Sequence, residues 1–345
     1  MNYKQWLLTT AILTTLFCSP FLYMIFYNFY VDPLWNFNHQ NKANESQIAF
    51  DERQLKVNYI SHQNQFDSLL VGTSRTTYIN QYDFKDMSVY NFSAGSLTLD
   101  EYGPYIRYAT EQNKKEFETI ILELYPTGNL DEALVSSYPE PETYFETTNA
   151  PLYSIKSLFS FDTYEKAKNN ASDETPKGFR IYDRNNVVSL DTVDIKTVQS
   201  NINRGLKKLG SVKESKDLTE YKKALYDIKE ASPNSKFIVY SPPFFHERLA
   251  KIFNKEGGIQ LYRDWLEACI EVFDGVVNFT TINDISLNVN NYFDTNHFYP
   301  STGTYIAKDI VAFNNGHPLQ YAAYVNTDNI DAFIEQFREQ MKEYR

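Results

Sequence analysis

The sequence has very few cysteines, and the two that it contains are poorly placed to pair. Cys18 lies in a long apolar stretch near the N-terminus, whereas Cys269 lies in a segment with helical periodicity. We therefore expect no disulfide framework, and cysteine usage does not identify the compartment in which the protein folds. Both glycine-rich phosphate-binding motifs are also missing, so a nucleotide-binding function has no support.

Positive charge is scarce and is not clustered. The 345 residues include 33 Lys and Arg against 44 Asp and Glu, which gives a formal net charge of −11 and a sequence pI of about 5.1. Proteins that bind nucleic acid usually present a basic patch or stripe, so we expect no nucleic-acid partner. The abundant Tyr (27) and Phe (25) are interpreted first as core and strand residues, with a sugar-stacking groove as the alternative.

One stretch, 6–31, has no charged residue and is rich in Leu, Ile, Phe and Tyr. It is longer than the roughly 20 residues that cross a bilayer. No small-residue cleavage site follows it, and the bulky Phe17 before Cys18 argues against a lipoprotein signal. We predict an uncleaved transmembrane signal-anchor at 1–31. Since Lys4 is the only cation before the span, the rest of the chain is expected outside the cytoplasm.

Beyond the anchor, 32–65 is predicted to be a juxtamembrane linker, and 66–325 to be one globular domain. In that domain short β-branched runs alternate with stretches of helical periodicity, a pattern typical of a mostly parallel sheet covered by helices on both faces. The predicted fold class is a three-layer α/β/α domain with a five-stranded sheet. The expected strands are 67–71, 89–92, 119–124, 237–240 and 276–279.

Two further segments complete the predicted organisation. The stretch 126–216 is too long for a simple crossover and is interpreted as an insertion, which either shapes a substrate groove or decorates the edge of the sheet. The segment 326–345 is predicted to be a C-terminal amphipathic helix. Its apolar residues recur at helical spacing: Ile330, Phe333, Ile334, Phe337 and Met341.

Two short segments carry the residue types of a site with a serine nucleophile. Ser74 follows the first predicted strand after Gly72, while Asp294 and His297 follow the last strand. The carboxyl ends of parallel strands lie along one edge of a sheet, so we expect both segments there. A serine becomes a good nucleophile when a histidine takes its proton and a carboxylate holds that histidine. We predict Ser74 as nucleophile, His297 as base and Asp294 as the residue that orients the base.

Each half of this site has a more ordinary interpretation when taken alone. Gly-x-Ser is often a turn or a helix cap, and an exposed Asp and His before a helix are common. Asp294 and His297 as metal ligands would need a third ligand, and none can be named, so no metal and no cofactor are predicted. His246, after the fourth strand in the proline-containing stretch 241–246, is a candidate for substrate binding or proton transfer, with a structural role as the alternative.

Together these segments resemble the SGNH (GDSL-like) hydrolase superfamily. The similarity is greatest to its membrane-anchored branch, which is involved in O-acylation of cell-surface polysaccharides. The chain is similar both to the exopolysaccharide O-acetylation proteins of this branch and to the proteins of D-alanyl-lipoteichoic-acid biosynthesis. The similar blocks stand in family order and are Asp-Ser-Leu-Leu-Val-Gly-Thr-Ser-Arg at 67–75, Tyr-Asn-Phe-Ser-Ala-Gly at 90–95 and Asp-Thr-Asn-His at 294–297. The resemblance covers 66–313, and Thr73 stands where the superfamily often has Asp.

The resemblance implies an oxyanion hole built from the backbone N–H groups of Ser74 and Gly95. The superfamily's third donor is an Asn in a Gly-x-Asn-Asp block after the third strand, whereas 121–126 here is Ile-Leu-Glu-Leu-Tyr-Pro. Arg75 and Asn91 are candidates for substrate or oxyanion contacts in its place. This departure weakens the expectation of a general esterase more than that of an acyltransferase.

The function implied by the resemblance is an extracytoplasmic, membrane-anchored serine acyltransferase. It would act on O-acyl groups, most simply acetyl, of a cell-surface polysaccharide through an acyl-serine intermediate. A membrane-bound O-acyltransferase is expected as the partner that supplies the acyl group. The alternatives are a polysaccharide O-acetylesterase with the same site and a non-catalytic polysaccharide-assembly subunit with the same fold.

Overall fold

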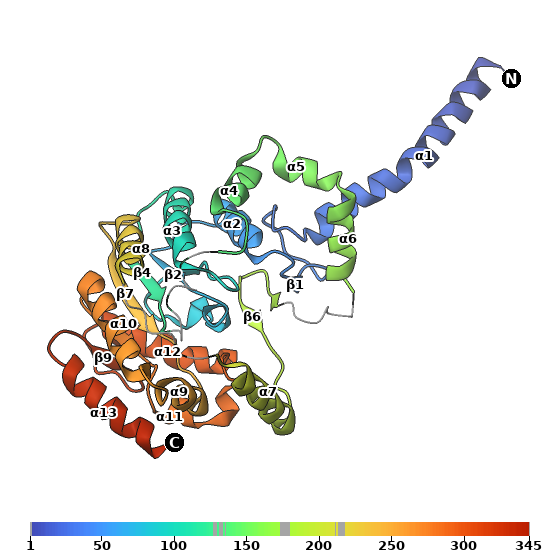
Figure 1. Cartoon of the computed structure of the whole chain (residues 1–345). Helices are drawn as coiled ribbons and strands as arrows, with labels where there is room; N and C mark the ends of the chain where they lie inside the picture. The colour runs from blue at the N-terminus through green and yellow to red at the C-terminus, as the bar shows by residue number, and fades with distance from the viewer. Residues whose placement is uncertain are drawn as a thin grey trace. The chain divides into compact units, whose positions relative to one another are not determined.

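The computed structural model divides the chain into two compact units, whose elements are labelled in Figure 1. The structure describes residues 2–126, 130, 134, 136–172, 180–210, 212 and 218–344. Unit 1 consists of Met1–Gln63 and Tyr144–Asn185, and unit 2 consists of Asn64–Thr143 and Asn186–Arg345. The predicted insertion is therefore shared between the two units, and most of the predicted linker belongs to unit 1.

Unit 1 begins with α1, Tyr3–Val31, a 29-residue helix that is long and apolar enough to cross a membrane. Asn2 caps its N-terminus together with Gln5, and Asp32 ends it in the left-handed conformation. The length and composition of α1 support an N-terminal membrane anchor or a signal sequence. The orientation of the anchor stays a prediction.

The remainder of unit 1 packs around the C-terminal turns of α1. Asn28, buried near the end of α1, donates from its amide to the carbonyls of Leu158 and Ser160 at 2.9 and 3.1 Å. The other elements of this unit are β1 (Gln47–Ile48), α2 (Glu52–His62), α4 (Pro141–Asn149, which begins in unit 2), α5 (Tyr153–Leu158), α6 (Phe161–Asn170) and β5 (Ile181–Tyr182). Strands β1 and β5 pair antiparallel.

Unit 2 is built on a six-stranded sheet in the order β3-β2-β4-β7-β8-β9. Its strands are β2 (Ser68–Val71), β3 (Val89–Asn91), β4 (Thr119–Glu123), β7 (Lys236–Ser241), β8 (Val276–Asn278) and β9 (Ala323–Val325). The first five strands in this order pair in parallel, and β9 adds antiparallel to β8. The prediction of a mostly parallel α/β sheet is confirmed.

The expectation of five strands was one too few, because β9 was missed. This strand has three residues, of which only Val325 is buried, and it pairs on one side alone. So short an edge strand shows neither a continuous apolar run nor a clear alternation. The central strands are different, since every residue of β2 and β4 is buried, as in parallel sheets that are covered by helices.

Helices α3, α8 and α10 of unit 2 pack one after another, with α3 against β2 and α10 against β7 and β8 (Figure 1). The helices of this unit are α3 (Leu99–Asn113), α7 (Ile195–Lys208), α8 (Thr219–Glu230), α9 (His246–Phe253), α10 (Gly258–Phe273), α11 (Asp284–Leu287), α12 (Pro300–Asn314) and α13 (Ile330–Glu343). Short elements are η1 (Thr76–Tyr78), η2 (Gln81–Asp83), η4 (Val289–Asn291) and β6 (Val188–Ser189). The C-terminal helix α13 contacts α10 and α9 through a buried apolar face.

The strand order places a topological switch point between β2 and β4. Along the chain, β3 adds on one side of β2, whereas β4, β7 and β8 add on the other side. In open α/β sheets, ligands bind outside the carboxyl ends of the strands at such a point. The residues that follow β2 and β4 are therefore the first place to look for a functional site.

Candidate active site

Ser74, His297 and Asp294 form a continuous series of hydrogen bonds. The Ser74 Oγ lies 2.8 Å from His297 Nε2, and His297 Nδ1 lies 2.9 Å from Asp294 Oδ2. A carboxylate accepts hydrogen bonds only, so Nδ1 carries the ring proton and Nε2 is left to accept from the serine hydroxyl. The arrangement suits transfer of the serine proton to the imidazole.

Asp294 is held by its own turn as well as by the imidazole. Its Oδ1 accepts from the backbone N–H groups of Asn296 and His297, each at 2.7 Å. Burial acts to raise the pKa of Asp294, but the hydrogen bonds and charge of His297 and these backbone donors outweigh burial and bring the pKa below its ordinary value. Asp294 is therefore ionised at neutral pH.

The imidazole is oriented by aromatic neighbours and remains accessible. The ring of Phe293 is stacked on that of His297 with centroids 5.6 Å apart, and Tyr78 presents an edge at 6.1 Å. The side chains of His297 and Asp294 are 22% and 31% exposed. A substrate can thus approach the histidine without a change in the fold.

Gly72 allows a buried carboxylate to pass close to the serine loop. A Cβ at this position would lie 2.6 Å from Oε2 of Glu123, the last residue of β4. Glu123 accepts from the backbone N–H of Thr73 at 2.6 Å and from the hydroxyl of Thr76. Gly72 does not have a positive φ, so glycine is needed here for the space that Glu123 occupies and not for the backbone conformation.

Arg75 forms a buried ion pair with Glu123 and is not an exposed arginine. Its Nε donates to Glu123 Oε1 at 2.6 Å, and its guanidinium lies 3.8 Å from the ring centroid of Tyr125. Burial acts to lower the pKa of Arg75, but the Glu123 carboxylate and Tyr125 hold it above its usual value. Arg75 and Glu123 join the loop after β2 to the end of β4, across the switch point.

Arg75 also fixes the orientation of Asn296, a residue that the sequence interpretation left without a role. Nη1 of Arg75 donates to Oδ1 of Asn296 at 2.9 Å. Since arginine only donates, the amide oxygen faces Arg75 and the NH₂ group faces away. That nitrogen, Nδ2, lies 3.4 Å from His297 Nε2. A side-chain donor therefore stands beside the reacting pair, although nothing in the sequence distinguishes Asn296 from an ordinary turn residue.

The predicted oxyanion residue Gly95 lies in a loop that runs beside the loop after β2. Phe92 N donates to Leu70 O at 2.8 Å, and Ala94 N donates to Gly72 O at 3.2 Å. These bonds extend the pairing of β2 and β3 beyond both strands. Gly95 follows directly and is thereby brought to the same edge of the sheet as Ser74.

Asn91, a candidate for substrate contact, instead organises the two loops. Its Nδ2 donates to the carbonyls of Thr76 and Ile79, each at 2.9 Å, and its Oδ1 accepts from Ser93 N at 3.1 Å. Both amide protons are therefore used within the protein. Asn91 is buried, so these bonds stabilise the loops that carry the site, and its contact with a substrate stays a prediction.

His246 is not brought together with the serine and the histidine of the candidate site. Its Nδ1 lies 3.3 Å from Ser286 O, and its ring lies 5.3 Å from that of Tyr344. It lines a cavity of about 500 Å³ at α9 and the C-terminus. Within the described residues it makes no hydrogen bond to Ser74 or His297, so these contacts favour the structural alternative.

Helix α7, which lies in the predicted insertion, supports the loop that carries the base. A Cβ on Gly205 would lie 3.1 Å from Cγ2 of Thr295, and Asn201 donates to Phe293 O at 3.1 Å. Close approach of the helix backbone thus requires glycine at this position. This part of the insertion packs on the base loop and is not a loose decoration.

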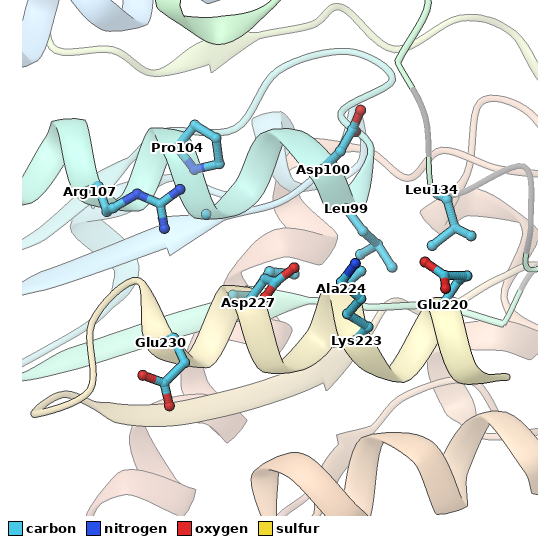
Figure 2. A pocket seen from close by; sticks show the side chains of 12 residues that line it. Leu99, Asp100, Pro104, Arg107, Leu134, Glu220, Lys223, Ala224, Asp227 and Glu230 are labelled. Carbon is cyan, nitrogen blue, oxygen red and sulfur yellow. The ribbon is translucent and has the colours of Figure 1, made fainter.

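A larger cavity of about 640 Å³ lies between α3 and α8 (Figure 2). Asp100 and Arg107 line it from α3, while Glu220, Lys223 and Asp227 line it from α8. Charges of both signs along two packed helices are typical of a solvated groove. None of its lining residues belongs to the candidate site.

No protein-family model and no curated protein sequence matches the chain. One solved structure from Streptococcus pneumonia, provisionally described as a platelet activating factor, is similar over 76% of this chain and 91% of that chain. The two share 9% sequence identity, and the TM-score is 0.35. A likeness of this size carries no argument about activity, so the function is argued from the site alone.

Proposed function

We propose that the protein is a membrane-anchored serine acyltransferase that acts on O-acyl groups of a cell-surface polysaccharide. The observation that carries the proposal is the series Ser74–His297–Asp294, with 2.8 and 2.9 Å between successive partners. Its place at the carboxyl edge of the sheet, next to the switch point, adds support. The polysaccharide and the acetyl group are implied by the motif resemblance.

The proposed reaction has two balanced halves. In the first, Ser74 Oγ attacks the acyl carbonyl while His297 Nε2 takes its proton, and the proton then passes to the departing donor as the acyl-serine forms. In the second, a sugar hydroxyl loses its proton to His297 and attacks the acyl-serine. The new ester leaves and Ser74 recovers the proton. Asp294 stabilises the imidazolium in both halves.

The oxyanion of each tetrahedral intermediate needs donors that are already in place. The backbone N–H groups of Ser74 and Gly95 are assigned by the motif resemblance. The amide of Asn296, turned by Arg75 so that its nitrogen lies 3.4 Å from His297 Nε2, is the third donor in this proposal. It takes the place of the Asn that the superfamily carries after its third strand.

Transfer is favoured over hydrolysis because of the predicted membrane anchor. In the described part of the chain, α1 is the only helix long and apolar enough to span a bilayer. One such helix cannot move an acyl donor across the membrane, so a membrane-bound O-acyltransferase is proposed as the supplier. The O-acetylesterase alternative uses the same residues. One observation favours this alternative: the side chain of His297 is 22% exposed, so water can reach the imidazole.

Labelling with a serine-reactive fluorophosphonate tests the constellation. The full-length protein in detergent is treated and the modified peptide is mapped. We expect the label on Ser74, and we expect its rate of formation to fall by about 10⁴-fold in His297→Ala. Ser189→Ala, which changes an exposed serine, is the matched control and should label normally. A label on another residue, or one that forms equally fast without His297, would contradict the proposal.

Acceptor dependence separates the transferase from the esterase. The purified full-length protein is given an aryl acetate with and without an oligosaccharide acceptor, and acetylated sugar is measured beside free acetate. Ser74-dependent acetylation of the sugar supports transfer. Rapid Ser74-dependent release of acetate that the acceptor does not divert would favour the esterase.

A further inference from the structure

Arg248 lies near the candidate site and has no counter-ion in the part of the chain that the structure describes. It lies in the first turn of α9, after the loop that follows β7. Its Nε is buried and has no hydrogen-bond partner among the residues that the structure describes. In the same residues no carboxylate lies within ion-pair distance of its guanidinium, which distinguishes it from Arg75, Arg180 and Arg184.

The surroundings of Arg248 place it beside the candidate active site. Its guanidinium lies 5.1 Å from the ring centroid of Phe244, and the guanidinium of Arg75 lies 5.2 Å from the same ring. Phe244 also contacts Tyr125 edge-on at 6.2 Å. Both arginines thus lie by one ring, and Arg75 holds Asn296 beside His297, so Arg248 lies near the residues that hold the reacting pair.

The two arginines beside Phe244 differ in what neutralises them. Arg75 is neutralised by Glu123 at 2.6 Å. Burial and the charge of Arg75 lower the pKa of Arg248 to about 10, while Tyr125 and Asp294 act to raise it. Arg248 is therefore still cationic at neutral pH. A half-buried cation that finds no counter-ion among the described residues is unfavourable for the free protein, and such costs are typical of functional sites.

We propose that Arg248 binds an anionic group, a carboxylate or a phosphate, that the substrate carries close to the reacting ester. Arginine presents two parallel N–H groups that match two oxygens of either anion, and this guanidinium lies by the face of the Phe244 ring. The chain carries a net charge of −11, so an acidic acceptor is repelled by most of the surface and needs a local cation. The substrate class is thus an acidic sugar polymer. This step relies on the proposed function only for the position of the reacting ester at Ser74.

Anion binding is tested first without catalysis. The full-length protein in detergent is titrated with inorganic phosphate, with glucuronate and with uncharged glucose at constant ionic strength, and the melting temperature is followed. We expect a saturable rise with at least one anion and none with glucose. Phosphate alone indicates a phosphorylated acceptor, and glucuronate alone indicates a carboxylated one. Absence of a response to both anions would overturn the proposal.

Variants assign the response to the residue. Arg248→Gln should abolish it, and Arg248→Lys, which keeps a point charge without the planar fork, should weaken the apparent affinity by about tenfold. Arg338→Gln, a change of an exposed arginine on α13, is the matched control and should respond as the wild type. An undiminished response in folded Arg248→Gln, or normal affinity in Arg248→Lys, would overturn the assignment.

A kinetic comparison separates this inference from the proposed function. The ratio of kcat/KM for 3-acetoxybenzoate to that for uncharged phenyl acetate should fall about tenfold or more in Arg248→Gln, mainly through KM. Arg338→Gln should keep the wild-type ratio. If Ser74 is required but the ratio does not depend on Arg248, the anion subsite is wrong and the proposed function stands. If anions bind through Arg248 but no ester reacts at Ser74, the anion subsite stands and the proposed function is wrong.

Discussion

Each unit of the protein buries an arginine against a carboxylate, and the two pairs have different surroundings. In unit 1, Arg184 donates to Asp32 at 2.7 Å and to Phe37 O at 2.8 Å. The Asp32 carboxylate also accepts from the backbone of Asn36 at 2.8 Å. Every partner of this pair belongs to the turn that follows α1. The pair closes a structural turn and leads to no reactive side chain.

In unit 2, hydrogen bonds link the pair of Arg75 and Glu123 to the residues of the candidate active site. The second guanidinium nitrogen of Arg75 reaches Asn296, and Asn296 lies next to His297 and so to Ser74. The same kind of ion pair therefore stabilises a turn in one unit and orients a possible catalytic donor in the other. Burial of a charged pair does not identify a site. Its connection to a nucleophile and a base does.

The largest loss of activity is expected from changes to the base and its carboxylate. His297→Ala and Asp294→Asn should each lower kcat/KM for ester substrates by about 10⁴-fold, because the serine loses its base or the base loses its tautomer. Assays with purified variants and matched thermal melts measure this. Retention of a tenth of wild-type activity in either variant would rule out the proposed roles.

The variants Glu123→Gln and Asp32→Asn compare how much each ion pair contributes to the free energy of unfolding. Each variant leaves a buried arginine without its counter-ion, so each should lose about 3–5 kcal/mol of unfolding free energy. Hydrogen exchange should report the loss in β2 and β4 for Glu123→Gln and at the end of α1 for Asp32→Asn.

Only one of these two variants should affect the chemistry. Among molecules that remain folded, Glu123→Gln should slow labelling of Ser74 by a phosphonate, since Arg75 no longer holds Asn296 in place. Asp32→Asn is the control, and its labelling rate per folded molecule should equal that of the wild type. Equal effects of the two variants on labelling would remove the distinction between the pairs.

A smaller effect is expected from Asn296 itself. Asn296→Ala removes one oxyanion donor and should lower kcat by about 10²–10³-fold with little change in KM. Asn201→Ala is the matched control, because this amide contacts the same loop at Phe293 O, 3.1 Å away, without facing His297. If the two variants lose the same activity, Asn296 only shapes the loop.

The smallest effect concerns Lys56, a buried lysine of unit 1 that lies 4.5 Å from the ring of Tyr182. Burial lowers its pKa to about 7. In the unfolded chain the pKa is about 10.4, so between these values the unfolded state binds more protons and stability rises with pH. The expected slope is at most about 1.4 kcal/mol per pH unit.

Hydrogen exchange of α2 at pH 7 and 9, compared with Lys56→Met, measures this slope after correction for intrinsic exchange rates. An equal slope in the variant would assign the effect to other groups.

Several features could be predicted from residue order because local physics determines them. Each of the five parallel strands has a short apolar run that is consistent with burial on both faces. Ser74 was proposed as the nucleophile because a serine shortly after such a strand lies at the carboxyl edge of the sheet. His297 and Asp294 were recognised by their spacing. The hydrogen bonds of Asn91 could not be predicted, because its partners, Thr76 O and Ile79 O, are backbone atoms that carry no sequence signal.

The sequence alone determined which residue types are available for chemistry and at which edge of the sheet they emerge, since strand patterning and a parallel sheet are sufficient for that. Only the tertiary structure decided how these residues are oriented. Arg75 turns the Asn296 amide, Glu123 neutralises Arg75, and among the described residues the buried Nε of Arg248 has no hydrogen-bond partner. These outcomes depend on distances of a few ångströms between loops that are far apart along the chain, and local periodicity contains no information about them.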